Sequence, residues 1–227
     1  MTGLGSAARR VNWLAVFWAG LTIAIVFLSG AFLGGTLFFT PFEPKTVHVD
    51  AVGVTSDDRL ELVDIAVSVS PGTGNLYANL VERQNLSREF QQSLVSAFQA
   101  AKSLAPSRLN NVDVSIRVSS LYEELGGNSG GAIVALGILS AAAGSKVRQG
   151  YYVTGSVDSS GFIHRVAYVP QKARFLQEYG AKSLIVSADE SIEGVESLTT
   201  RARTLKDAAC LVLEGPVLEG LNCTQGA

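Results

Sequence analysis

The stretch from Leu125 to Ala143, LGGNSGGAIVALGILSAAA, joins a glycine-rich loop to an apolar segment of about three helical turns. The loop contains one serine, Ser129, just before the apolar segment. Because nearly every residue from 132 to 143 is apolar, we expect a helix that is buried on all sides. Gly144 is placed to end it. The stretch therefore predicts a domain built around one buried helix, with a loop serine at its N-terminus.

Outward from this helix, predicted strands and further helices occur without strict alternation. Alternating and β-branched patterns predict strands at 46–54, 60–70, 75–81, 112–118, 151–157, 162–166, 182–187 and 211–213. The segments 151–157 and 162–166 are expected to form a hairpin. Helical spacing and capping signals predict helices from Ser87 to Pro106, from Pro170 to Tyr179 and from Val195 to Ala209. The mixture predicts an α+β fold.

The loop Gly126-Gly127-Asn128-Ser129-Gly130-Gly131 is the strongest local signal of chemistry. Glycines let the backbone approach a ligand closely, and the following helix directs free N–H groups and a positive dipole end toward the same point. The backbone N–H groups of Asn128 and Ser129 are candidates for holding an oxyanion beside the serine hydroxyl. A plain glycine-rich turn, in which Ser129 only caps the helix, is equally compatible with this local sequence.

Two functional interpretations of the loop fit the rest of the chain poorly. A trypsin-like nucleophile needs a histidine and an aspartate earlier in the chain, whereas only His48 precedes Ser129 and a helix rather than a strand follows it. A phosphate-binding loop of the Walker type needs a lysine at the start of the helix. Here Gly144-Ser145-Lys146 stands at a helix end.

A third interpretation rests on a family resemblance: residues 129–187 resemble the proteolytic domain of Lon-type proteases. The similarity lies in a loop serine that opens an apolar helix, a Thr-Gly pair, a hairpin glycine and a lysine on a glycine-terminated helix: Ser129, Thr154-Gly155, Gly161, Lys172 and Gly180. The resemblance implies a Lon-type proteolytic fold and a Ser129–Lys172 catalytic dyad, with Thr154 orienting the lysine amine. It also implies a serine endopeptidase acting on peptides or unfolded proteins, and it permits a ring-shaped homo-oligomer.

The chain departs from the Lon pattern at several positions near the dyad. Gly126 and Asn128 stand where the family has Asp and Pro, Ser156 stands where it has Glu, and Ala167-Tyr168 replaces a Gly-Gly pair. These differences leave the dyad intact. They also support a second hypothesis, a catalytically inactive Lon-like domain used for binding or assembly. We expect neither a cofactor nor an ATPase domain to take part.

The proposed base, Lys172, requires burial. A lysine at its ordinary pKa of about 10.4 is protonated at neutral pH and is useless as a base, whereas burial lowers that pKa. Apolar neighbours in sequence and the lack of acidic residues over 159–177 favour a neutral amine. The pairs Asp57-Asp58 and Asp189-Glu190 are expected to be solvated turns. Taken alone, Lys172 is more typical of a solvated helix lysine.

The N-terminal region holds no charged residue from Val11 to Phe42. We expect a transmembrane anchor at 11–39 rather than a cleaved signal peptide, because the apolar run exceeds the ~20 residues of a span and has no clear cleavage site. Arg9 and Arg10 predict a cytoplasmic N-terminus at 1–10, a linker at 40–45 and an extracytoplasmic domain at 46–227.

Composition excludes some classes of protein. With 47% hydrophobic residues, 17% charged residues and a net charge of −2, the chain is neither disordered nor basic enough for nucleic-acid binding. Cys210 and Cys223 are expected to form a disulfide in an exported domain, with two free thiols as the alternative. His48 and His164 are single and far apart in sequence, so we expect no metal site.

Overall fold

The computed structural model describes residues 21, 44–55, 58–80, 85–119, 124–125, 127–215 and 220–223. The chain divides into two compact units, Met1–Phe42 and Glu43–Ala227. The predicted cytoplasmic segment 1–10, the anchor 11–39 apart from Leu21, and most of the linker lie outside the described residues. Within the described ranges, no helix combines the length and apolar character needed to cross a membrane.

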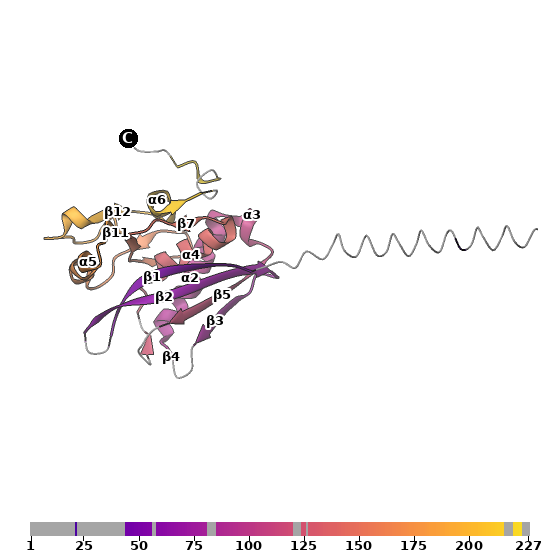
Figure 1. Ribbon diagram of the computed structural model, residues 1–227, viewed down its shortest axis with the longest axis horizontal. Helices are drawn as coiled ribbons and strands as arrows, with labels where there is room; N and C mark the ends of the chain where they lie inside the picture. The colour runs from indigo at the N-terminus through magenta and orange to yellow at the C-terminus, as the bar shows by residue number, and fades with distance from the viewer. Residues whose placement is uncertain are drawn as a thin grey trace, which may run out of the picture. The chain divides into compact units, whose positions relative to one another are not determined.

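A four-stranded sheet forms one layer of the second unit, in the order β1-β2-β5-β3 (Figure 1). Its strands are β1 (Lys45–Val54), β2 (Leu60–Pro71), β5 (Val112–Ser119) and β3 (Leu76–Leu80). The central strand β2 is antiparallel to both β1 and β5, and β3 runs parallel to β5. Their alternation puts one face into the core, which Val49, Ile65, Val67 and Ile116 line.

The buried helix predicted from the apolar segment is confirmed as α4 (Gly131–Ala143), in which all residues except Ala142 are buried. In Figure 1 it lies between the four-stranded sheet and α6 (Leu205–Val212), while α2 (Arg88–Leu104) packs beside it. Gly144 ends α4 in the left-handed region, with φ of +69°, where glycine avoids the strain of a side chain. Ser87 caps α2 by accepting from the Phe90 N–H at 3.2 Å. The short α3 (Pro106–Leu109) follows α2.

A second, parallel sheet has the order β12-β11-β8. It comprises β8 (Tyr151–Val153), β11 (Ser183–Ser187) and β12 (Thr199–Ala202), and α5 (Val169–Glu178) packs against it through a separate apolar cluster. Small pairs complete the fold: β9 (Ser156–Val157) with β10 (Ile163–His164), β7 (Lys146–Val147) with β13 (Leu213–Glu214), and β4 (Asn85–Leu86) with β6 (Glu124–Leu125). The predicted α+β class is confirmed.

Three predictions of local structure were wrong. The helix expected over 195–209 is instead the 3₁₀ turn η1 (Glu196–Leu198), then β12, then α6, because a capping box between Thr204 and Asp207 starts the helix only at Leu205. This helix also takes up most of the strand expected at 211–213. The strand expected over 151–157 divides at Thr154-Gly155 into β8 and β9, which join different sheets.

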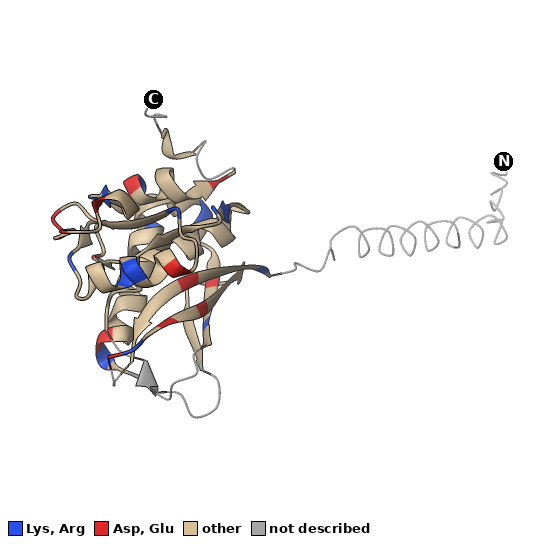
Figure 2. Ribbon diagram, turned by 60° about the vertical axis from the view of Figure 1, so that its left-hand side comes forward, with Lys and Arg blue, Asp and Glu red and all other residues tan. Residues whose placement is uncertain are grey.

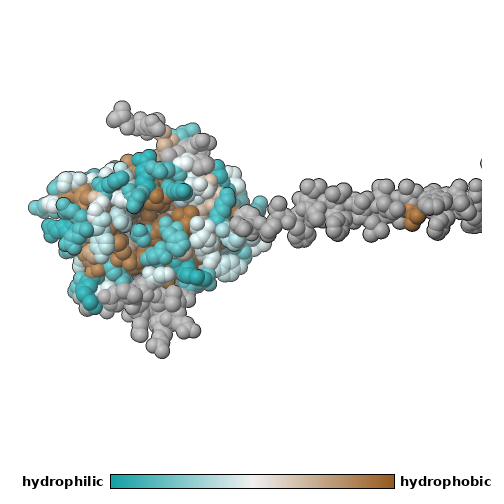
Figure 3. All heavy atoms as spheres, in the orientation of Figure 1, coloured by the Kyte–Doolittle hydropathy of each residue, from teal (hydrophilic) through white to brown (hydrophobic). Residues whose placement is uncertain are grey.

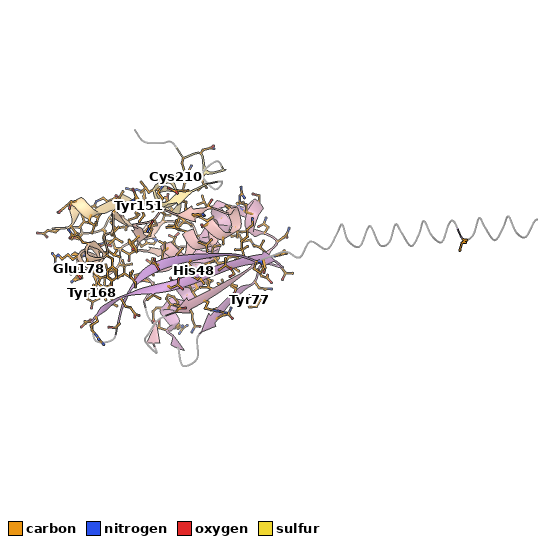
Figure 4. The ribbon with its side chains drawn as sticks, in the orientation of Figure 1. His48, Tyr77, Tyr151, Tyr168, Glu178 and Cys210 are labelled. Carbon is orange, nitrogen blue, oxygen red and sulfur yellow. A yellow bond between two sulfur atoms is a disulfide. The ribbon has the colours of Figure 1, made fainter. Side chains whose placement is uncertain are left out.

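Near the C-terminus, the structure joins Cys210 on α6 to Cys223 in a disulfide, with their Cα atoms 5.5 Å apart. Figure 4 labels Cys210 at the α6 side of the domain. The bridge therefore fastens the last described residues, 220–223, to a buried helix.

Candidate active site

The glycine-rich loop is fixed in place by backbone contacts to the break between β8 and β9. The Ser129 carbonyl accepts from the Gly155 N–H at 2.9 Å, and the Gly155 carbonyl accepts from the Ala132 N–H at 3.0 Å. From α2, the Ser93 hydroxyl donates to the Asn128 carbonyl at 3.4 Å. The break at Thr154-Gly155 thus frees the Gly155 backbone groups to bond to the loop that contains Ser129 and to the start of α4.

Ser129 is not the cap of α4, so the plain capping interpretation is wrong. The N-cap position is Gly130, and no side chain caps the helix there. Ser129 is half-buried, and its hydroxyl makes no hydrogen bond to any residue that the structure describes. The backbone N–H groups of Asn128 and Ser129 likewise donate to no protein acceptor within these ranges. The loop thus presents, close together in the chain, a hydroxyl and two N–H groups that bond to none of the described residues.

Lys172 is buried rather than solvated. Its side chain is 1% exposed on the inner face of α5, and Nζ donates to Thr154 Oγ1 at 3.2 Å. Thr154 is 2% exposed and donates in turn to the Ser129 carbonyl at 3.4 Å. The three residues predicted for the site therefore come from three separate segments and meet in one place. Among the hydrogen bonds of the described residues, none joins Ser129 Oγ directly to Lys172 Nζ.

Burial gives the Lys172 amine an unusual acidity. Removal of the ammonium from water lowers the pKa of Lys172 from 10.5 to about 8, and the negative charge of Glu190 opposes part of that fall. A substantial fraction of the amine is then neutral just above physiological pH. A neutral amine of this kind can accept a proton from a nearby hydroxyl.

The expectation that Glu190 lies in a solvated turn is wrong. The residue is 6% exposed and follows β11 in the chain, far in sequence from Lys172. Its carboxylate accepts from the Val166 N–H at 2.9 Å and from the Ser191 N–H at 3.2 Å. Only the tertiary fold brings this carboxylate near the lysine, so the absence of acidic residues over 159–177 was an incomplete guide.

Tyr168 introduces α5 in a conformation that is unusual for a tyrosine. Its φ is +65°, in the left-handed region, and its carbonyl accepts the first helical bond from the Lys172 N–H at 2.9 Å. The side chain is 46% exposed, and its hydroxyl donates to Asp58 at 3.4 Å. Figure 4 shows Tyr168 at the α5 side of the domain. Pro170 lies in the first turn, as predicted.

The two histidines lie apart in the structure and each pairs with one aspartate. His48 Nδ1 on β1 is 2.9 Å from Asp64, and His164 Nε2 is 2.8 Å from Asp158. Among the described residues, no group of three or more His, Cys, Asp or Glu side chains is arranged to hold a metal ion. Figure 2 shows acidic and basic residues interspersed over the second unit rather than separated by sign.

Comparison with known proteins shows a distant similarity to a protease. No protein-family model matches the chain. In an alignment 163 residues long that covers 68% of the chain, the sequence is 28% identical to the archaeal Lon protease of Methanocaldococcus jannaschii. The matched part makes up 25% of that protein, so the chain spans about a quarter of the relative's length. The chain is therefore distantly similar to a Lon protease over part of that protein.

Proposed function

We propose that the second unit is a Lon-like serine endopeptidase in which Ser129 is the nucleophile and Lys172 the general base. Its substrates would be peptides or unfolded proteins, and it would act without ATP. The observation that carries the proposal is the burial of the Lys172 amine against Thr154, whose hydroxyl contacts the Ser129 loop. The distant similarity to a Lon protease supports the same assignment.

The proposed mechanism moves one proton between two side chains. The neutral amine of Lys172 takes the proton of the Ser129 hydroxyl as the oxygen attacks the scissile carbonyl. The resulting oxyanion is stabilised by the N–H groups of Asn128 and Ser129. Lys172 then gives the proton to the leaving amine, and water hydrolyses the acyl-enzyme by the same exchange in reverse. For attack, Ser129 Oγ must approach Nζ to roughly 2.6–3.2 Å in the substrate complex.

The test is digestion of unstructured casein by the full chain. Ser129→Ala and Lys172→Ala should each abolish cleavage, whereas Lys182→Ala, which removes an exposed lysine just beyond α5, should leave cleavage unchanged. The value of kcat/KM should rise about tenfold per pH unit from pH 5 to 7 and level off above about 8, where the amine is neutral. Equal cleavage by the wild-type and Ser129→Ala proteins would exclude the proposed nucleophile.

A catalytically inactive Lon-like binding or assembly domain is the second candidate. Two observations favour it: no hydrogen bond joins Ser129 Oγ to Lys172 Nζ, and Gly126 and Asn128 replace the family's Asp and Pro. In that case the wild-type chain would bind casein without cleaving it. Co-sedimentation of intact casein with the wild-type protein would distinguish this outcome from proteolysis.

The cellular arrangement is a further proposal that rests on the sequence. An uncharged run from Val11 to Phe42, preceded by Arg9 and Arg10, supports a single-pass anchor with the peptidase domain outside the cytoplasm. The full chain should remain with membranes after alkaline extraction, and a chain lacking residues 1–42 should not. Recovery of the full chain in the soluble fraction would exclude the anchor. Light scattering of the purified protein tests assembly into a ring.

A further inference from the structure

The buried carboxylate of Glu190 does not belong to the dyad, yet it contacts the segment that leads into the helix of Lys172. One oxygen accepts from the Val166 N–H at 2.9 Å, three positions before α5 begins. The other accepts from the Ser191 N–H and lies 3.7 Å from Arg165 Nε. Because Glu190 is almost wholly buried, these contacts fix the turn between β10 and α5 to the end of β11.

The turn needs such support because it contains a strained residue. Tyr168 adopts a left-handed conformation that costs a non-glycine residue energy, and such a residue persists where its surroundings hold it. From this turn, α5 carries Lys172 one helical turn further on, its N–H bonded to the Tyr168 carbonyl. A shift of the turn would therefore move the Lys172 amine away from Thr154.

The charged groups around Lys172 are few. Among the described residues, Glu190 alone exerts a resolved charge–charge effect on the amine, although no ion pair joins them directly. Arg165 faces Glu190 with a side chain that is 65% exposed, so it offsets the carboxylate from the solvent side. On α5 itself, Arg174 and Glu178 are exposed, and Figure 4 shows Glu178 at the outer side of the domain.

On the β9–β10 side, one histidine pairs with one aspartate. His164 and Asp158 form their own exposed pair at 2.8 Å. Thr154, which is uncharged, is the direct partner of the amine. Among the described residues, the resolved charge effect on Lys172 thus comes from one buried anion, Glu190, which the exposed Arg165 faces.

We propose that Glu190 is a positioning residue for the site: it holds the turn that introduces the Lys172 helix and, together with Arg165, sets the charge to which the buried amine is exposed. Only the effect of Glu190 on catalysis rests on the proposed function; its effect on Lys172 does not. The pairing predicts that Glu190 and Arg165 act on the lysine in opposite directions, which a purely structural role would not produce.

The direct test measures the titration of Lys172 by NMR in the full chain carrying Ser129→Ala, which removes any self-cleavage. Glu190→Gln keeps the size of the side chain and removes its charge, so the pKa of Lys172 should fall by on the order of one pH unit. Arg165→Gln leaves the carboxylate uncompensated, so the pKa should rise, by less, because Arg165 is exposed.

Two variants serve as controls. Arg174→Gln removes an exposed cation from the same helix and should leave the titration of Lys172 unchanged. Glu190→Asp keeps the charge on a shorter side chain and should restore the wild-type midpoint more closely than Glu190→Gln. If Glu190→Gln fails to fold, Arg165→Gln still tests the proposal, because the Arg165 side chain lies at the surface and its replacement should not disturb folding.

Activity gives the second readout. The acid limb of the pH profile of kcat/KM for casein should move down with Glu190→Gln and up with Arg165→Gln. Equal midpoints in the wild-type, Glu190→Gln and Arg165→Gln proteins would overturn the proposal even if the chain is an active peptidase. Opposite shifts of the NMR midpoint in a chain that cleaves nothing would uphold the proposal and reject the peptidase function instead.

Discussion

Replacing Lys172 with methionine should make the folded chain more stable at pH 7. Methionine resembles lysine in length but carries no charge to bury. Burial lowers the pKa of Lys172 from 10.5 to about 8, and each unit of that difference corresponds to 1.36 kcal/mol, so the buried amine costs the folded state about 3 kcal/mol at pH 7. Loss of the hydrogen bond to Thr154 removes about 1 kcal/mol of this. The expected net gain is about 2 kcal/mol.

The pH dependence of stability independently tests whether Lys172→Met raises or lowers the free energy of unfolding. The unfolded lysine keeps its proton up to about pH 10.5, whereas the folded one loses it near pH 8. Between these values the unfolded chain binds more protons, so the stability of the wild-type chain rises with pH. The advantage of Lys172→Met should therefore be full below pH 8 and decline steadily from pH 8 to 10.5. Urea unfolding followed by circular dichroism at pH 6 to 10 measures it.

The matched control is Lys182→Met, which replaces an exposed lysine and should change the free energy of unfolding by less than about 0.5 kcal/mol at each pH. A Lys172→Met chain that is less stable than the wild type at pH 7 would contradict the reasoning. So would a difference that stays constant from pH 7 to 10. Either result would mean that the amine is hydrated and cationic in solution.

Three further predictions concern Thr154, the neighbouring Gly155 and the disulfide. Thr154→Val removes the hydroxyl that accepts from the lysine amine and should lower kcat on casein by more than tenfold with little change in KM, whereas Thr154→Ser, which keeps the hydroxyl, should stay near the wild type. Gly155→Ala would bring a Cβ to 2.6 Å from Ile163 Cγ2, so the free energy of unfolding should fall by about 1–3 kcal/mol, measured in urea, and cleavage should fall with it. Cys210→Ser removes the disulfide that closes a loop of sequence separation 13, so the free energy of unfolding, measured by thermal unfolding, should fall by about 3 kcal/mol. A wild-type chain whose melting temperature does not change under reducing conditions would contradict this.

The surface offers few other features with a clear partner. On the face drawn in Figure 3, apolar residues are exposed in small groups among hydrophilic ones. Large apolar side chains stand partly exposed at separate places: Tyr77 on β3, Val95 on α2 and Tyr179 just after α5. Scattered exposure of this kind is normal in soluble domains. The region around Ser129 and Lys172 remains distinctive because it combines a buried lysine with a glycine-rich loop.

Much of the fold could be predicted because it depends on local chemistry. The apolar run of α4 predicted its burial, and Gly144 predicted where it ends. Ser87 likewise predicted where α2 begins. The alternation of β1, β2 and β5 gave nearly their observed bounds. Prediction failed where a local pattern was ambiguous. The segment 195–209 contains enough apolar spacing for a helix, yet pairing with β11 draws Thr199–Ala202 into a strand.

The sequence by itself determined the residue types available for chemistry: a serine in a glycine loop, a lysine on a later helix and a Thr-Gly pair between them. The tertiary structure alone decided that Lys172 is out of water, that the break at Thr154-Gly155 contacts the serine loop, and that Glu190 comes near the amine. The physical reason is that the pKa of a lysine depends on burial and on charges from distant segments. These are set by the packing of the two sheets around α4 and α5, not by neighbours along the chain.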